Sequence, residues 1–69
     1  MPYKLTPLGN SVAVRIPRVD SPENAVLVYL YEHPEPVEVE ELVGELRTTE
    51  NLVLMVLNRF INKEYVKEL

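Results

Sequence analysis

The spacing of apolar residues from Ala25 to Lys67 is the feature that most constrains how this chain can fold. Apolar positions recur there at intervals of three and four residues, which predicts amphipathic helices. The pattern divides into three helical segments and a last, shorter segment with the character of a strand. Their expected bounds are residues 20–32, 38–46, 48 or 49 to 63, and 65–69.

Start and stop signals support these segments. Asp20 offers a side-chain acceptor for an N-cap, Pro22 suits a first helical turn, and Glu23 stands at capping-box spacing from Asp20. The first helix should end near Glu32, because a residue that precedes a proline, here His33, is pushed out of the α region. Apolar residues cover nearly the whole circumference of this first helix, so we expect it at the centre of the domain.

Residues 1–19 predict a β-hairpin. Turn-forming residues occupy positions 7–10, and the apolar residues between positions 11 and 16 alternate as they do in a strand. The predicted arms are residues 3–6 and 11–16, and Pro17 would stop the ladder because it has no N–H group. The expected fold class is therefore α+β: one domain, residues 1–69, with three helices and a hairpin that pairs with the C-terminal strand.

Size and composition limit the ways in which such a domain can be stabilised. A chain of 69 residues forms one domain that buries about 60% of its unfolded surface. It has no cysteine, so helix packing and a dimer interface are the expected supports. No signal peptide follows Met1, and the longest apolar run is far shorter than the roughly 18 residues of a membrane span. We expect a cytoplasmic protein without a membrane partner.

The charge of −4 is unevenly distributed along the chain. Residues 1–19 carry three basic residues and no acid, whereas residues 20–50 carry nine acids and one arginine. Residues 51–69 have three basic and two acidic residues. Because cations supply most of the affinity for nucleic acid, a polyanion should avoid the middle of the chain and contact its two ends.

The predicted order of elements resembles the winged helix, and VLVYLYEHPEPVEVEELVGEL resembles the first two helices of many small transcription regulators. The similarity covers about two thirds of the chain. In that family the return strand of the wing often reads Y-x-L-T-x-x-G, and residues 3–9 are similar to it but lie at the opposite end of the chain. We therefore expect the wing sheet to be completed from the N-terminus, as in a circular permutation.

A second, shorter resemblance covers residues 9–17, GNSVAVRIP, which are similar to the opening signature of swapped-hairpin antitoxins of the MazE and AbrB type. In that family this strand helps a dimer to bind operator DNA. The resemblance implies Asn10, Ser11 and Arg15 as candidate DNA contacts. The Gly-Asp turn and second hairpin expected downstream are missing.

The sequence predicts neither an enzyme nor a cofactor. It has one histidine, no cysteine, and no serine placed with a histidine and an acid in a recognisable catalytic arrangement. His33 should make a capping contact or be favoured as a cation at the end of the first helix. The glutamates of residues 35–45 have no calcium-loop spacing and predict a solvated helix face.

The third predicted helix carries more apolar residues than one neighbour can cover. On a helical wheel its apolar arc is about 200°, wider than the roughly 100° stripe of a singly packed helix. Where a DNA reader needs donors and acceptors, this helix is apolar. A protein interface, packing by the N-terminal hairpin, and DNA contact all remain open for this surface. The candidate interface residues are Leu52, Met55, Val56 and Arg59.

If the termini pair, the basic residues should form a strip on the sheet that contacts phosphates without reading sequence. The alternative is an edge whose charge only prevents aggregation. The candidate DNA-binding residues are Lys4, Arg15, Arg18, Lys63 and Lys67. Two functions follow: a homodimeric, winged-helix transcription regulator with weak, salt-sensitive binding to duplex DNA, or a protein–protein interaction module without DNA binding.

Overall fold

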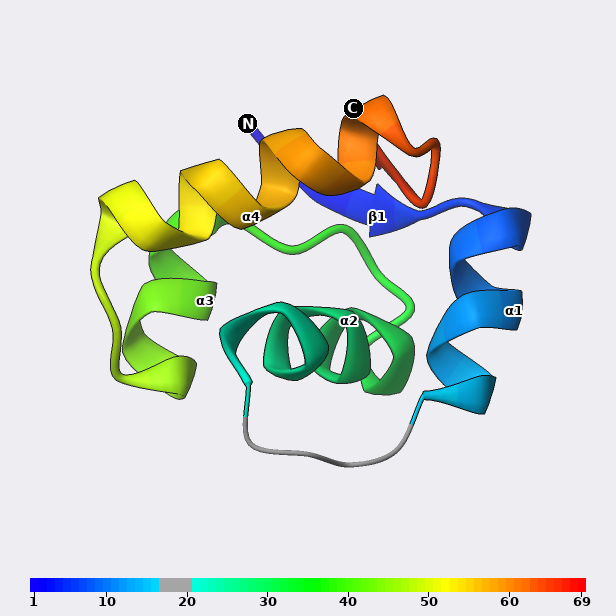
Figure 1. Cartoon of the computed structure of the whole chain (residues 1–69). Helices are drawn as coiled ribbons and strands as arrows, with labels where there is room; N and C mark the ends of the chain where they lie inside the picture. Colours follow the sequence, from blue (N-terminus) through cyan, green and yellow to red (C-terminus); the bar gives the residue numbers. More distant parts are fainter. Residues whose placement is uncertain (17–20) are drawn as a thin grey trace.

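The computed structural model describes residues 1–16 and 21–69, in which four helices pack around a sheet made from both ends of the chain (Figure 1). The α+β class is as predicted, whereas the described residues hold one helix more than expected. In chain order the elements are β1 (Tyr3–Leu5), α1 (Pro7–Arg15), α2 (Pro22–Glu32), α3 (Val39–Leu46), α4 (Glu50–Asn62) and β2 (Val66–Glu68).

The additional helix is α1, and it replaces the predicted hairpin. Residues 7–10, read as a turn, form its first turn, and residues 11–15, read as a strand, complete it. Thr6 is the N-cap: its Oγ1 accepts a hydrogen bond from the Gly9 N–H at 3.0 Å. Pro7 follows at a position where its missing N–H costs nothing. The strand implied by the antitoxin-like residues is therefore helix as far as Arg15, and Pro17 lies outside the described residues.

A short apolar run of this kind does not by itself distinguish strand from helix. In α1 the burial differs from the predicted strand pattern, which set Val14 on the apolar face and Ala13 on the other. Ala13 is buried, whereas Val14 is 62% exposed. Gly9 makes the packing possible: a Cβ built there would lie 1.9 Å from the carbonyl oxygen of Tyr65. The start of α1 thus lies directly against the main chain that leads into β2.

The sheet pairs the two ends of the chain, which confirms the predicted contact between the N-terminal strand and the C-terminal strand. β1 and β2 are antiparallel, with Tyr3 opposite Glu68 and Lys4 opposite Lys67. The ladder continues beyond the strands, because the Thr6 N–H donates to the Tyr65 carbonyl and the Leu69 N–H donates to the Pro2 carbonyl, both at 2.9 Å. β1 alone makes this pairing, since the second arm of the predicted hairpin is helical.

The three helices predicted from residues 20–63 are confirmed, with small differences at their ends. Ser21 caps α2 by accepting from the Asn24 N–H at 3.1 Å, while the predicted cap Asp20 lies outside the described residues. Thr49 caps α4 through its hydroxyl, which accepts from the Leu52 N–H at 3.3 Å. Each cap satisfies one N–H group that has no partner inside its helix.

As expected, α2 is central. It packs against α1, α3, α4 and β1, and Figure 1 shows it between α1 and α3 with α4 crossing above. Burial of each large aliphatic side chain contributes about 1.5–3 kcal/mol, so this shared core holds the elements together. Among the described residues, no helix combines the length and apolar character needed to cross a membrane. The most deeply buried side chains are Val26, Leu42, Val53, Val56 and Leu57.

Candidate interaction surfaces

The apolar arc of α4 is largely covered, which corrects the predicted exposed patch. Val56 is 1% exposed and belongs to the core, and Leu52 is half-buried. Leu52 lines a pocket of about 300 Å³ formed with the start of α2 and the end of α3. On the other side of α4, Ile61 packs beside β2. The arc is wide because α4 has neighbours on both sides. Of Leu52, Met55 and Val56, the three apolar residues predicted for the interface, Met55 alone is exposed, at 47%.

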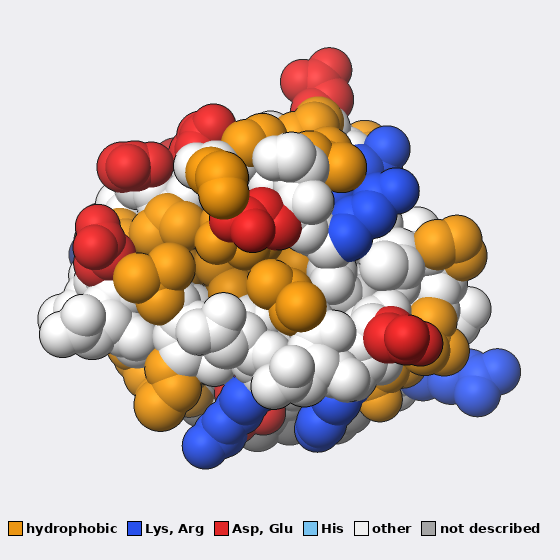
Figure 2. Space-filling view, turned by 90° about the horizontal axis from the view of Figure 1, so that it is seen from above, with side chains coloured by type: hydrophobic (Ala, Val, Ile, Leu, Met, Phe, Trp, Pro, Cys, Tyr) orange, Lys and Arg blue, Asp and Glu red, His pale blue; other side chains and the backbone are white. Residues whose placement is uncertain are grey.

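An uncharged stripe faces solvent along α4. Asn51, Met55, Asn58 and Asn62 are all exposed, and their spacing places them on the side of the helix opposite the core. This is unusual for a solvent face in a chain of which 26% of residues are charged. Figure 2 views the domain from above α4: apolar side chains gather on this face, with an acidic side chain among them and further charged side chains toward the border.

Arg59 lies beside this stripe and is engaged in an ion pair. Its Nη1 donates to Glu23 Oε1 at 2.7 Å, which connects α4 to the first turn of α2. Both side chains are about half-exposed, so the pair contributes little to stability. Glu23 binds Arg59, while Asp20, its partner in the predicted capping box, lies outside the described residues.

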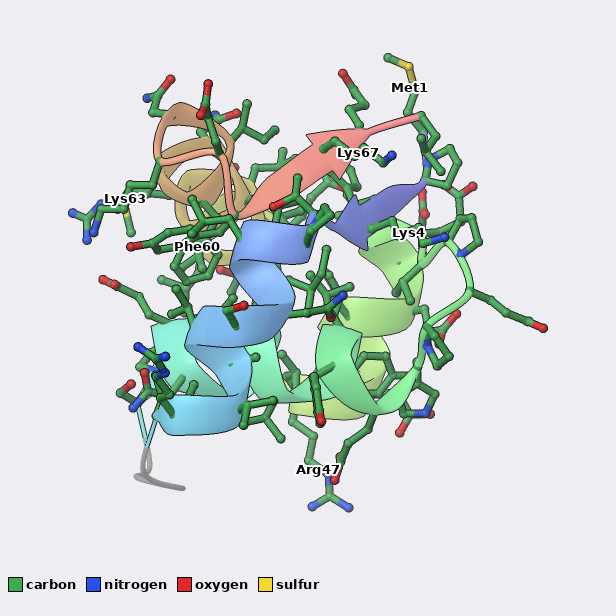
Figure 3. All side chains as sticks on the ribbon, turned by 90° about the vertical axis from the view of Figure 1, so that its right-hand side faces the viewer. Met1, Lys4, Arg47, Phe60, Lys63 and Lys67 are labelled. Carbon is green, nitrogen blue, oxygen red and sulfur yellow. The ribbon has the colours of Figure 1, made fainter. Side chains whose placement is uncertain are left out.

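The predicted basic strip is not assembled. Lys4 and Lys67 are cross-strand partners on the exposed face of the sheet. Figure 3 shows them together, while Lys63 projects from the opposite side of the domain. Arg15 lies in the last turn of α1, at the end far from the sheet, and Arg18 lies outside the described residues. Of the five candidates, the structure brings Lys4 and Lys67 together.

A polar cluster at the end of α2 was not predicted from the sequence. The Tyr29 hydroxyl donates to the Glu41 carboxylate, and its ring stacks on His33 with centroids 3.9 Å apart. This hydrogen bond is the main cause that raises the pKa of Tyr29 to about 12, with burial and the charges of Glu41 and Glu45 adding to it. His33 is the C-cap residue, and its Nδ1 lies 2.9 Å from the Tyr29 carbonyl oxygen, the capping contact expected for it. The spacing of four residues between the two rings was the available signal.

Comparisons with known proteins give this chain no relative. No protein-family model matches it, and neither the curated proteins nor the solved structures include a match.

Proposed function

We propose that this domain is a protein-interaction module that pairs with a second copy of itself through the exposed stripe of α4. The observation that carries the proposal is the absence of charge along this stripe, together with the exposed Met55 at its middle. A solvent-facing helix normally carries charged side chains, and exposed apolar area marks an interface more often than an accident. A chain of this size also gains from any surface that it can bury on association.

The spacing of the stripe suits a two-fold interface. Its positions are separated by four, three and four residues, an order that is the same in both directions. An antiparallel α4 from a second copy would therefore place Asn51 opposite Asn62, and Met55 opposite Asn58, on both sides of the axis. Asparagine amides are both donors and acceptors, so facing amides can pair. Met55 is flexible enough to fill the contact at the centre.

Size-exclusion chromatography with light scattering, run at several protein concentrations, tests this proposal. Met55→Asp should convert the dimer into a folded monomer, because it places a carboxylate from each copy in the interface. Val14→Asp is the matched control: it makes the same change at an apolar side chain that is 62% exposed on α1, and should leave the dimer intact.

The proposal fails if the unaltered chain is a monomer at every concentration. It also fails if Val14→Asp dissociates the dimer as fully as Met55→Asp does. Circular dichroism of both variants separates dissociation from unfolding, because the monomer should keep the helical spectrum of the dimer.

A winged-helix regulator that binds duplex DNA is the second candidate function, and the Lys4–Lys67 pair favours it. Like charges directly opposite each other across a sheet are unfavourable, and a phosphate between them would relieve this repulsion. The helix–turn–helix order of α3 and α4 is in keeping with this function. The exposed glutamates of α3, Glu40, Glu41 and Glu45, argue against a duplex on that side. In the DNA-binding candidate, the α4 helices of two copies form the dimer, and the sheet of each copy contacts phosphates of the DNA backbone.

A further inference from the structure

The outer edge of β2 is open, whereas the outer edge of β1 is covered. In the ladder, residues 65, 67 and 69 direct their main-chain groups toward β1. Val66 and Glu68 therefore direct their N–H and C=O groups to the other side of β2. The equivalent groups of Tyr3 in β1 exchange two hydrogen bonds of 2.8 Å with Val37. Within residues 1–16 and 21–69, no such segment pairs with the outer edge of β2.

A groove of about 520 Å³ lies beside this edge. The start of α1, the end of α4 and β2 form its walls, and Leu8, Ile61 and Val66 supply its apolar lining. Leu8 is 49% exposed, so the groove is accessible from solvent. Its charged lining residues are Lys67, Glu64 and Glu68. The open main-chain groups and the apolar groove are thus adjacent, which is the combination that binds an extended peptide.

Charge indicates which residues such a peptide would carry. A strand added beside β2 would place one side chain next to Lys67, on the face that Lys4 and Lys67 already share. An acidic residue there would compensate two lysines that otherwise repel each other. Its neighbours along the strand would point to the opposite face, toward Leu8 and Ile61, where apolar side chains fit.

The covered edge of the same sheet provides an internal comparison. Val37 pairs with Tyr3 of β1, and it is followed by Glu38, the N-cap of α3, and by Val39, the first residue of that helix. Both valines are buried, and Glu38 receives an ion pair from the Met1 amino group at 3.1 Å. One edge of this sheet is thus already covered by an apolar residue that is followed by an acidic one.

A second copy of β2 fits this edge poorly. Pairing about a two-fold axis that passes between two copies of Lys67 places these lysines opposite each other. A shift toward Val66 sets Glu64 against Glu68, and a shift toward the C-terminus sets Glu68 against its own copy. Every antiparallel register that uses the open groups therefore brings like charges together, which is destabilising.

We propose that the outer edge of β2 binds an extended segment of another protein, with the pattern apolar–acidic–apolar, as an added strand of the sheet. The site shares no residue with the stripe of α4, so it goes beyond the proposed self-association. Loss of the α4 dimer in Met55→Asp should leave peptide binding at β2 unchanged.

A titration followed by amide NMR tests the proposal with the ¹⁵N-labelled full chain. The probe is an acetylated and amidated peptide, Ser-Val-Glu-Val-Glu-Val-Ser, and the control peptide has lysine in place of each glutamate. We expect the acidic peptide to shift the amides of Val66 to Leu69, Leu8 and Ile61, and to slow hydrogen exchange at Val66 and Glu68. The lysine peptide should bind more weakly.

Two substitutions distinguish strand addition from loose attraction. Glu68→Pro removes an N–H that points away from β1, a position at which an edge strand tolerates proline. It should weaken binding about fivefold to tenfold, the effect of one lost hydrogen bond, while Glu68→Gln retains the N–H and should bind as the unaltered chain does. Lys67→Glu should reverse the preference, so that the lysine peptide binds better than the acidic one. This test remains valid even if Glu68→Pro does not fold.

The proposal is wrong if neither peptide shifts the β2 amides, or if both peptides bind Lys67→Glu and the unaltered chain equally. A mixed-sequence DNA duplex at low salt provides the remaining comparison. Salt-sensitive shifts at Lys4 and Lys67 with the duplex, and none with the acidic peptide, would assign this surface to nucleic acid instead.

Discussion

Replacement of Gly9 by alanine should destabilise the domain, although alanine is the better helix former. A Cβ at this position would lie 1.9 Å from the carbonyl oxygen of Tyr65 and 2.8 Å from its carbonyl carbon. Both atoms belong to the main chain and cannot rotate away, so α1 must move from residues 64–66. The same junction contains two hydrogen bonds of Thr6, to the Tyr65 carbonyl at 2.9 Å and to the Glu64 carbonyl at 2.5 Å.

The size of the effect follows from these contacts. An added methyl group in a packed site costs about 1–3 kcal/mol, and each weakened hydrogen bond adds roughly 1 kcal/mol. The higher helix propensity of alanine returns about 1 kcal/mol. The net loss in the free energy of unfolding should be about 2–4 kcal/mol, which lowers the Tm of a domain of this size by roughly 10–30 °C.

Gly44→Ala is the matched control, because no atom lies within 4 Å of a Cβ built at Gly44. Gly44 lies inside α3, so the same substitution there should raise stability by about 0.5–1 kcal/mol. Thermal and urea denaturation, followed by circular dichroism, measure both variants. If Gly9→Ala is as stable as the unaltered chain, α1 does not pack against Tyr65 as described, and the helical assignment of residues 7–15 loses its main support.

Two further perturbations address the cap of α1 and the cluster at the end of α2. Thr6→Ala should lower the free energy of unfolding by about 1–2 kcal/mol, because it removes a cap, whereas Thr6→Ser should restore most of it in the same urea titration. The raised pKa of Tyr29 means that its contribution to stability is complete below pH 10.0 and is lost as pH rises through about 12. Ultraviolet titration should show Tyr29 ionising late, and Glu41→Ala should return its pKa toward 10.0; an unchanged titration would exclude the Glu41 hydrogen bond as the cause.

The helices α2, α3 and α4 could be predicted because each has an apolar helical period, and α2 also has start and stop signals at Pro22 and His33. The pairing of β1 with β2 was also predictable, since two short strand-like segments at the ends of the chain each need a partner. Residues 7–16 were read wrongly because Pro7 and Gly9 suit a turn and a helix start equally well. The helical outcome depends on contacts with α2 and Tyr65, which are distant in sequence.

The surfaces were harder to predict than the elements. The breadth of the apolar arc of α4 was read correctly, but Val56 was assigned to solvent because the wheel does not reveal that α4 has neighbours on both sides. The basic residues near the two ends could not be sorted without the register that sets Lys4 opposite Lys67. The open edge of β2 could not be predicted, because it depends on which N–H and C=O groups of β2 form hydrogen bonds with β1. The register of the two strands determines this, and composition does not.

The pairing of β1 with β2 has a mechanical consequence. Residues 1 and 69 lie at the same end of an antiparallel ladder, where the Leu69 N–H meets the Pro2 carbonyl at 2.9 Å. A pulling force applied to these two residues would load that hydrogen bond first and then the next ones in turn, which is the unzipping geometry. The unfolding force is therefore set by single hydrogen bonds and not by the whole sheet. Pulling the two termini apart would open the domain at a force well below that needed to shear the same strands.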